Sequence, residues 1–266
     1  MARGLVAAVV LAGVIAAASG CGGGDEEASP PAPVPTPAPV ATVPISVPSP
    51  EPTCEPGARQ LGGSDAAYAA TVVRATAARR APGGAPVARF RPINVNGVPT
   101  VLGVLAVQRD RSCAPAWYRV QLPVRPNGSV GWVRAADVRL SRVTTRIVVD
   151  LSDRRVTLYR DGERVLSTTA AIGKPGTPTP TGRYYVNQRL LAADPGGPFG
   201  PGAVGISAFS PTLQYWTQGG PIAIHGTNTP YKLGLAVSYG CVRIANSHLL
   251  RLFAEADEGT PVVIRS

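Results

Sequence analysis

The hydrophobic and polar residues of this chain alternate in short runs, a pattern that favours β-strands over long helices. In the C-terminal half these runs are rich in β-branched and aromatic residues, and they cover residues 147–151, 156–159, 164–172, 184–186, 222–224 and 262–264. Asp161-Gly162 lies between two of them and predicts a tight hairpin turn. Residues 195–205 are too rich in glycine to predict a regular element.

One segment near the C-terminus has a helical spacing instead. Asn246 is a preferred residue for a helix N-cap, and Leu249, Leu250 and Phe253 then give one apolar face. Gly259 is a signal that ends such a helix. The pattern therefore predicts a domain over residues 144–266 that is mostly β, with one or two short helices.

A smaller β domain is predicted over residues 54–142. Strand-like runs cover residues 98–107, 117–122 and 131–133, and Pro126-Asn127-Gly128 supplies a turn between the last two. Residues 68–78 fit a strand or a helix equally well. The fold class expected for the whole chain is mostly β.

The aromatic pattern of the smaller domain resembles that of bacterial SH3-like β-barrels. In such modules a strand pair that contains tryptophan closes a small barrel, and here Trp117 and Trp132 flank the turn. A generic small β domain is the alternative. The two tryptophans fit either core positions or a binding surface.

Residues 1–20 are expected to be a secretion signal. Arg3 gives a positive start, and the apolar run at residues 5–18 is shorter than the roughly 20 residues of a membrane-spanning helix. The sequence Ala18-Ser19-Gly20-Cys21 resembles the bacterial lipobox, with alanine in place of the usual leucine. We expect Cys21 to carry a lipid; an ordinary secreted protein is the alternative.

Residues 21–53 are expected to be an extended linker. Ten prolines recur between positions 30 and 52, with little to bury. At about 3.1 Å per residue, a polyproline II segment of this length reaches roughly 70 Å. The expected location is extracytoplasmic, on the cell-wall side of the cytoplasmic membrane, with the lipid as the only membrane contact.

The balance of charge suggests which partners the exported protein meets. The net charge is +10, and Lys174 and Lys232 are the only lysines. Such a protein is expected to meet anionic wall polymers and carboxylate-bearing peptides rather than nucleic acid. Salt would screen the attraction.

Two motifs near the C-terminus carry the candidate chemistry. His225 lies in Ala-Ile-His-Gly-Thr at 223–227, and Cys241 lies in Ser-Tyr-Gly-Cys-Val-Arg at 238–243. A thiol nucleophile needs a base to take its proton, and histidine titrates near the working pH. Arg243 offers a fixed positive fork for a carboxylate. Together these residues predict covalent acyl transfer on a substrate that carries a carboxylate.

Residues 146–265 resemble an L,D-transpeptidase catalytic domain of the YkuD type. The resemblance rests on the opening hairpin, on Thr179-Pro180-Thr181-Gly182, and on the two motifs with their spacing. It implies that Cys241 attacks the carbonyl between meso-diaminopimelate and D-alanine in a peptidoglycan tetrapeptide stem, which releases D-alanine and forms a thioester. An amine of a neighbouring stem then gives a 3→3 cross-link. Peptidoglycan stems are thus the expected donor and acceptor, and no cofactor is implied.

Residues around the pair are expected to contact the substrate. The expected set is Gly226, Thr227, Ser238, Tyr239, Gly240 and Arg243. Arg243 either pairs with a stem carboxylate or stabilises the loop, and Ser238 fits a loop-stabilising hydroxyl better than a proton relay. Backbone N–H groups of residues 239–241 are expected to form an oxyanion hole. A backbone carbonyl near Gly226 is expected to orient His225.

One position departs from the family. The usual residue between Ser238 and Gly240 is a second histidine, whereas this chain has Tyr239. We expect activity with altered substrate contacts, because His225 fits the base role and Tyr239 can still donate a hydrogen bond. The departure leaves two alternatives open: a non-catalytic peptidoglycan-binding lipoprotein, and an L,D-carboxypeptidase that uses water as acceptor.

The remaining cysteines and histidine are interpreted by elimination. If Cys21 is lipidated and Cys241 is catalytic, Cys54 and Cys113 remain. In an oxidising compartment they are expected to form a disulfide worth about 4 kcal/mol; two free thiols are the alternative. His248 is expected at the surface. No metal site is expected, because the usual zinc spacings are missing, and the expected state is a monomer.

Overall fold

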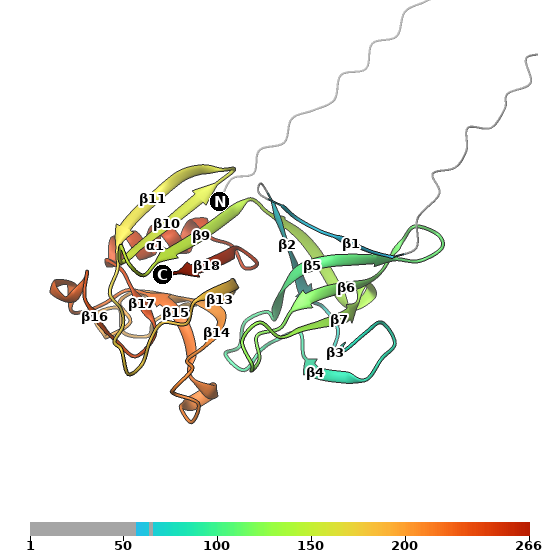
Figure 1. The fold of residues 1–266 in the computed structure, drawn as a ribbon, viewed down its shortest axis with the longest axis horizontal. Helices are drawn as coiled ribbons and strands as arrows, with labels where there is room; N and C mark the ends of the chain where they lie inside the picture. Colours follow the sequence, from blue (N-terminus) through green and yellow to red (C-terminus); the bar gives the residue numbers. More distant parts are fainter. Residues whose placement is uncertain (1–56, 64–65) are drawn as a thin grey trace, which may run out of the picture. The chain divides into compact units, whose positions relative to one another are not determined.

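The computed structural model describes residues 57–63 and 66–266 (Figure 1). The expected signal peptide, Cys21, the linker and Cys54 lie outside the described residues, so their roles stay predictions. Among the described residues, no helix is both long and apolar enough to cross a membrane.

Residues 58–143 form an eight-stranded antiparallel sheet. Its strands are β1 (Ala58–Gln60), β2 (Ala67–Val72), β3 (Thr76–Arg79), β4 (Pro86–Phe90), β5 (Val101–Arg109), β6 (Pro115–Gln121), β7 (Val130–Arg134) and β8 (Val138–Val143), with the 3-10 helix η1 (Ala135–Asp137) before β8. Their order is β4-β3-β7-β6-β5-β2-β8, and β1 pairs with β5. The three predicted strands are confirmed as β5, β6 and β7, and the ambiguous segment 68–78 forms strand rather than helix.

This sheet builds its own small core. Along β6, for example, Tyr118 and Val120 are buried, whereas the residue between them is exposed. Trp117 and Trp132 are half-buried and do not belong to the buried cluster. Their indoles are therefore not central core residues. The identification of this part as an SH3-like barrel stays a prediction.

Residues 145–265 form a second, mixed sheet of eight strands. Its elements, with the short pieces between them, are β9 (Thr145–Asp150), β10 (Arg155–Arg160), β11 (Glu163–Thr169), β12 (Ile172–Gly173), β13 (Gly182–Leu191), β14 (Gly202–Phe209), η2 (Thr217–Gly219), β15 (Pro221–His225), η3 (Pro230–Lys232), β16 (Ala236–Ser238), β17 (Val242–Arg243), α1 (Asn246–Glu255) and β18 (Pro261–Arg265). The order is β11-β10-β9-β18-β13-β14-β15-β17, and β12 and β16 form a separate pair. The mostly β fold class with a short helix is confirmed.

Two local predictions in this domain had different outcomes. The turn at Asp161-Gly162 is confirmed, because both residues have positive φ angles, 49° and 84°, between β10 and β11. The prediction of no regular element over 195–205 is wrong at its end, since β14 begins at Gly202. Small residues let this strand approach β13 closely: a Cβ on Gly205 would lie 2.7 Å from Gln188 Cγ.

The helix α1 also differs from its prediction. Ala245 occupies the N-cap, and no side chain caps the helix, so Asn246 has another role. Leu249 and Leu252 are its buried residues, whereas Leu250 is exposed. Successive residues turn by about 100° around a helix, so Leu250 cannot share the face of Leu249.

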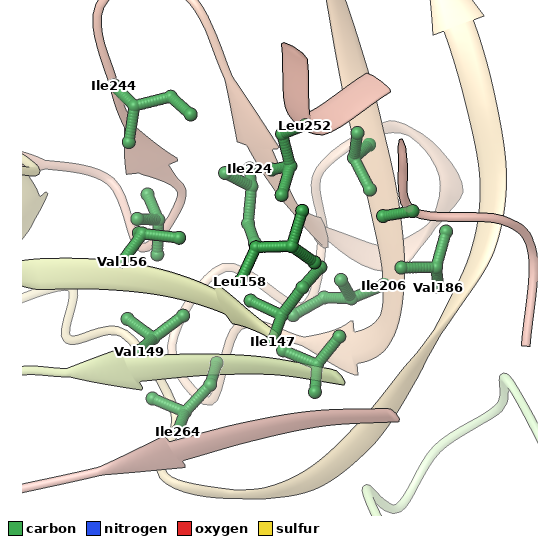
Figure 2. Close-up of a cluster of buried hydrophobic side chains, with 14 of the residues drawn as sticks. Ile147, Val149, Val156, Leu158, Val186, Ile206, Ile224, Ile244, Leu252 and Ile264 are labelled. Carbon is green, nitrogen blue, oxygen red and sulfur yellow. The ribbon is translucent and has the colours of Figure 1, made fainter. Parts of the chain in front are cut away.

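Figure 2 shows the core of the C-terminal domain. Aliphatic side chains from the sheet and from α1 meet there, among them Ile147, Val149, Val156, Leu158, Val186, Ile206, Ile224, Ile244, Leu252 and Ile264. Burial of each such side chain stabilises the fold by about 1.5–3 kcal/mol. Ile224 lies in β15 and Ile244 directly follows β17. The core therefore fixes β15, which ends at His225, and β17, which begins directly after Cys241.

Tyr185 of β13 connects the two sheets, which belong to one compact unit. Its side chain is buried, and its hydroxyl donates a 3.1 Å hydrogen bond to the carbonyl of Val101 in β5. Gly103 lies against the ring, where a Cβ would be 2.8 Å from Cδ1 of Tyr185. This contact leaves no room for a side chain at position 103.

Candidate active site

His225 is the last residue of β15, a strand that lies between β14 and β17. Ile222 and Ile224 of the same strand are buried in the core. Side chains alternate along a strand, so His225 projects from the face opposite to Ile224. The imidazole is nevertheless only 3% exposed.

A backbone carbonyl orients the His225 ring. Nδ1 lies 2.6 Å from the carbonyl oxygen of Gly226. Because a carbonyl only accepts, Nδ1 carries the proton and donates, and Nε2 of the neutral ring is left as a free base. The expected orienting carbonyl near Gly226 is thus confirmed. Phe199 packs against the ring, with 4.8 Å between the centroids.

The surroundings keep His225 neutral. Burial lowers its pKa from 6.5 to about 4; the positive charge of Arg243 acts in the same direction, and the bond to Gly226 opposes both. The imidazole is therefore uncharged at neutral pH, which is the form that can accept a proton.

Cys241 lies in the turn between β16 and β17, and it is the free cysteine of the described residues. Burial raises the pKa of its thiol, while a backbone hydrogen bond from Ala223 and the charge of Arg243 lower it. Burial is the largest of these effects. The thiol is thus protonated at neutral pH, and its nucleophilic form requires a base.

Strand pairing brings the two candidates together. β15 and β17 run parallel, with His225 opposite Arg243. Cys241 directly precedes β17 and so falls opposite Ala223, one diagonal step from His225. Diagonal neighbours in a sheet lie about 7–8 Å apart, within reach of longer side chains. The charge of Arg243 shifts the pKa of both His225 and Cys241, which indicates that it lies close to each.

Arg243 carries a charge that the described residues do not neutralise. Its Nε atom is buried and has no hydrogen-bond partner, and no described carboxylate forms an ion pair with it. Its backbone is held on both sides, by Ala171 and by β15. A buried donor without a partner is costly, so the site suits a ligand that brings an acceptor.

The turn before Cys241 is closed by Ser238. Its Oγ donates to the carbonyl of Cys241 at 2.5 Å and accepts from the N–H of Gly240 at 3.1 Å. Gly240 has φ +114°, and a Cβ there would lie 2.9 Å from Ile222 Cδ1, so the turn requires glycine. Because the Gly240 N–H is used inside the turn, it is not available to an oxyanion. Ser238 is fully buried and shapes the turn instead of facing a substrate.

Two threonines also form hydrogen bonds with this turn. The sequence did not indicate a role for either of them. Thr179 Oγ1 donates to the carbonyl of Gly240 at 2.8 Å and accepts from the N–H of Gly173 at 2.9 Å. Thr177 Oγ1 donates to the carbonyl of Ser238 at 3.0 Å. Both side chains are buried. Thr179 belongs to the motif Thr179-Pro180-Thr181-Gly182, which the sequence did bring to notice. Its role could not be predicted, because it depends on contacts with residues distant in sequence.

The segment after His225 is held by Asn246. The N–H of Thr227 donates to Asn246 Oδ1 at 2.7 Å. Gly226 and Gly200 lie so close to this amide that a Cβ on either would be 2.3 Å from Oδ1. The hydroxyl of Thr227 contacts Thr229 within the same loop. Asn246 therefore positions the Gly226 carbonyl that orients His225, and sequence reasoning assigned it to a helix cap instead.

Tyr239 lies on the outside of the site. Its side chain is 49% exposed, unlike its neighbours Ser238 and Gly240. The ring packs against Trp216, with 5.5 Å between centroids, and Lys174 Nζ lies 4.6 Å from the ring centroid. The residue at the position of the family's second histidine thus contacts two neighbouring loops.

The other candidate residues lie elsewhere or outside the described part. His248, expected at the surface, is half-buried in the first turn of α1, with Nδ1 2.7 Å from Thr168 Oγ1. Cys113 is not free, and its expected partner Cys54 is not described, so that pairing stays a prediction. Among the described residues, no three His, Cys, Asp or Glu side chains gather as a metal site would require.

A buried neutral histidine, a free thiol and an unpaired guanidinium on one sheet edge are the groups that a cysteine nucleophile needs. Comparison with known families agrees with this class of site. Residues 144–264 match the model of the YkuD family, the L,D-transpeptidase catalytic domain. The match covers the second sheet except for its last residue, Arg265, and includes both motifs.

The chain is also similar to individual relatives and to parts of solved structures. The chain is 37% identical over 119 residues to YkuD of Bacillus licheniformis and 35% identical over 118 residues to YkuD of Bacillus subtilis, both named as L,D-transpeptidases. These matches cover 45% and 44% of this chain and 64% of each relative. An L,D-transpeptidase from Mycobacterium smegmatis is 18% identical with a TM-score of 0.39, covering 62% of this chain and 90% of that one. The catalytic domain of an Enterococcus faecium L,D-transpeptidase is 27% identical with a TM-score of 0.34, covering 46% and 96%.

Proposed function

We propose that this protein is a peptidoglycan L,D-transpeptidase that works through a Cys241 thioester and forms 3→3 cross-links. The observation that carries the proposal is the edge formed by β15 and β17. There a neutral base, a free thiol and a cation without a partner project from paired strands. The family match of residues 144–264 supports the same reaction class.

In the first half-reaction, Nε2 of His225 takes the thiol proton as Sγ of Cys241 attacks the carbonyl carbon between meso-diaminopimelate and D-alanine. The carbonyl becomes an oxyanion, for which the backbone N–H of Cys241 is a candidate donor. When the intermediate collapses, the C–N bond breaks, and His225 gives its proton to the amine of the departing D-alanine. A thioester on Cys241 remains.

In the second half-reaction, the side-chain amine of another stem attacks the thioester carbon. His225 accepts a proton from that amine, the C–S bond breaks, and Cys241 recovers its proton. An amide between two stems forms, and the enzyme is restored. If water replaced the amine, the same steps would give a shortened stem, which is the L,D-carboxypeptidase alternative.

Arg243 is proposed to bind a carboxylate of the donor stem. Its buried Nε has no partner among the described residues, and a guanidinium holds a carboxylate in a fixed orientation through two hydrogen bonds. Its other proposed role, loop stabilisation, has less support, because the hydrogen bonds between Arg243 and Ala171 are made by backbone atoms.

The decisive experiment uses a disaccharide-tetrapeptide, with products identified by mass. A cross-linked dimer supports the transpeptidase, a tripeptide alone supports the carboxypeptidase, and no product with retained binding supports the non-catalytic alternative. Cys241→Ala is the control for chemistry, and it should abolish both product formation and the acyl-enzyme mass. Product that survives this substitution would exclude the thioester mechanism.

We also propose that the protein is exported and anchored by lipid at Cys21, so that the linker extends the folded part into the wall. The lipobox-like sequence and the proline-rich segment support this. The mass of the mature N-terminus tests it: an unmodified residue 21 would exclude the anchor.

A further inference from the structure

The exposed aromatic residues of this protein are concentrated near the candidate active site. Among the described residues, five aromatic side chains are exposed: Phe199, Tyr215, Trp216, Tyr231 and Tyr239. All belong to the loops and short elements between β13 and β17, the part of the chain that contains His225. The first sheet, with aromatic residues of its own, exposes none of them in its described part. Such a grouping points to a binding surface.

Two contacts of Tyr239, one with Trp216 and one with Lys174, define a platform that consists of these three residues. Lys174 lies over the ring of Tyr239, and Trp216 packs against that ring at an interplanar angle of 49°. Tyr239 therefore contacts both a cation and an indole. Trp216 remains 53% exposed, so much of its surface is free for a ligand. The segment that carries Trp216 projects between β14 and β15 (Figure 1).

The platform is continuous with the catalytic turn. The backbone N–H of Lys174 donates to the carbonyl of Ser238 at 3.0 Å. Tyr239 stands two residues before Cys241, which keeps their Cα atoms within roughly 7 Å of each other. A ligand on Trp216 would thus lie next to Tyr239, which is two residues from the cysteine that would carry the acyl group.

We propose that this platform binds a sugar ring of the glycan strand to which the donor stem is attached. A pyranose ring presents apolar C–H faces that pack on an aromatic face, with hydroxyl and amide groups around its edge. The platform matches both features, because the indole N–H of Trp216, the hydroxyl of Tyr239 and the ammonium of Lys174 have no hydrogen bond or ion pair in the described residues. The inference rests on the proposed function, since only a peptidoglycan donor carries both a stem and a sugar.

The reach of a stem agrees with this placement. Three residues separate the scissile bond from the sugar-bearing end of a tetrapeptide stem, and an extended chain of three residues spans at most roughly 11 Å. A sugar at that end therefore stays close to Cys241, and the platform is an exposed aromatic surface that adjoins the turn before Cys241. A membrane or another protein would fit less well, because the platform offers polar groups between its rings and no aliphatic side chains.

The first test is binding of an N-acetylglucosamine tetramer, which has no stem, to the full chain by titration calorimetry. Trp216→Ala should weaken binding about 2- to 10-fold, the range expected for one aromatic contact. Tyr231→Ala is the matched control, because Tyr231 is also an exposed aromatic beside a lysine, Lys232, but lies outside the platform. No binding by the wild-type chain, or equal loss in both variants, would overturn the proposal.

The second test separates this inference from the proposed function. KM is measured for a disaccharide-tetrapeptide and for the sugar-free tetrapeptide. Trp216→Ala should raise KM for the first by about 2- to 10-fold more than for the second. Equal increases would show that Trp216 contacts the peptide or only supports the loop, and would refute the sugar site. If neither substrate reacts, the proposed function fails, while the tetramer titration still decides whether a sugar binds.

Discussion

The resting state of the catalytic pair leads to a sharp prediction about pH. Burial lowers the pKa of His225 to about 4 and raises that of Cys241. The free protein should therefore hold a neutral thiol beside a neutral imidazole at pH 7, rather than a thiolate–imidazolium ion pair. These two states differ in how the thiol reacts as the pH changes.

The magnitude follows from the pKa of His225. At pH 5.5, a histidine of pKa about 4 is roughly 97% neutral, whereas an ordinary histidine of pKa 6.5 is only about 9% neutral. Activity that requires the neutral base should thus persist at pH 5.5 and fall only as the pH approaches 4. Below pH 6.5 the unfolded chain binds a proton that the folded chain does not. Folding stability should therefore decrease by up to about 3 kcal/mol between pH 6.5 and pH 4.

The assay combines two profiles. The rate of alkylation of Cys241 by iodoacetamide should rise continuously with pH up to pH 9 without a plateau near neutrality, because the thiol pKa is raised. The value of kcat/KM should fall on the acid side only below pH 5, where His225 becomes protonated. Cys241→Ala corrects the alkylation data for any other reactive group.

An alkylation plateau between pH 5 and pH 8 would refute this reasoning, because it would reveal an ion pair with an acidic thiol. Arg243→Gln gives a second check. Removal of its charge should raise the pKa of both His225 and Cys241, so the acid limb should move to higher pH while alkylation becomes slower. An acid limb that moves to lower pH, or a faster alkylation, would contradict the placement of Arg243 close to both residues.

Three further predictions concern the residues that hold the two motifs. Gly240→Ala should destabilise the fold by about 1–3 kcal/mol, because φ is +114° and the new Cβ meets Ile222; an unchanged unfolding midpoint would contradict the strained turn. Thr179→Val should cost about 1–3 kcal/mol by leaving buried backbone groups unpaired, and Thr179→Ser should restore most of this; equal loss in both would point to packing instead. Asn246→Ala removes the acceptor of the Thr227 N–H and should lower kcat while shifting the acid limb, whereas Asn246→Asp keeps an acceptor; a loss of stability with an unmoved pH profile would exclude the positioning role.

Much of the fold could be predicted from local pattern, because strands with one buried face have a period of two. The hairpin at Asp161-Gly162 is an example, since its turn type depends on two adjacent residues. β14 was missed for the converse reason. Glycine is unfavourable in a strand when only the local sequence is considered. In the assembled sheet the glycines of β14 allow β13 to approach closely, and this gain is not visible in the sequence.

In the candidate site, too, some residues could be selected from the local sequence, whereas others depend on the assembled fold. His225 and Cys241 could be selected as candidates from the sequence, because a cysteine and a histidine that each lie beside a glycine are typical of a nucleophile and its base. The supporting residues could not be assigned, because their partners are distant in the chain: Thr179 lies 61 residues from Gly240, and Asn246 lies 19 from Thr227. Asn246 also had a strong local alternative as a helix cap, and the tertiary hydrogen bond prevailed.

The position of Arg243 beside both His225 and Cys241 argues against a role for its charge in driving proton transfer. Proton transfer from Cys241 to His225 creates a negative and a positive charge side by side, with no change in net charge. A cation close to both stabilises the thiolate and destabilises the imidazolium, and both effects are present here. These contributions largely cancel, so Arg243 can do little to drive the transfer. Its unpaired guanidinium is better explained by a carboxylate of the donor, whose charge would also remove the penalty that Arg243 imposes on the protonated base.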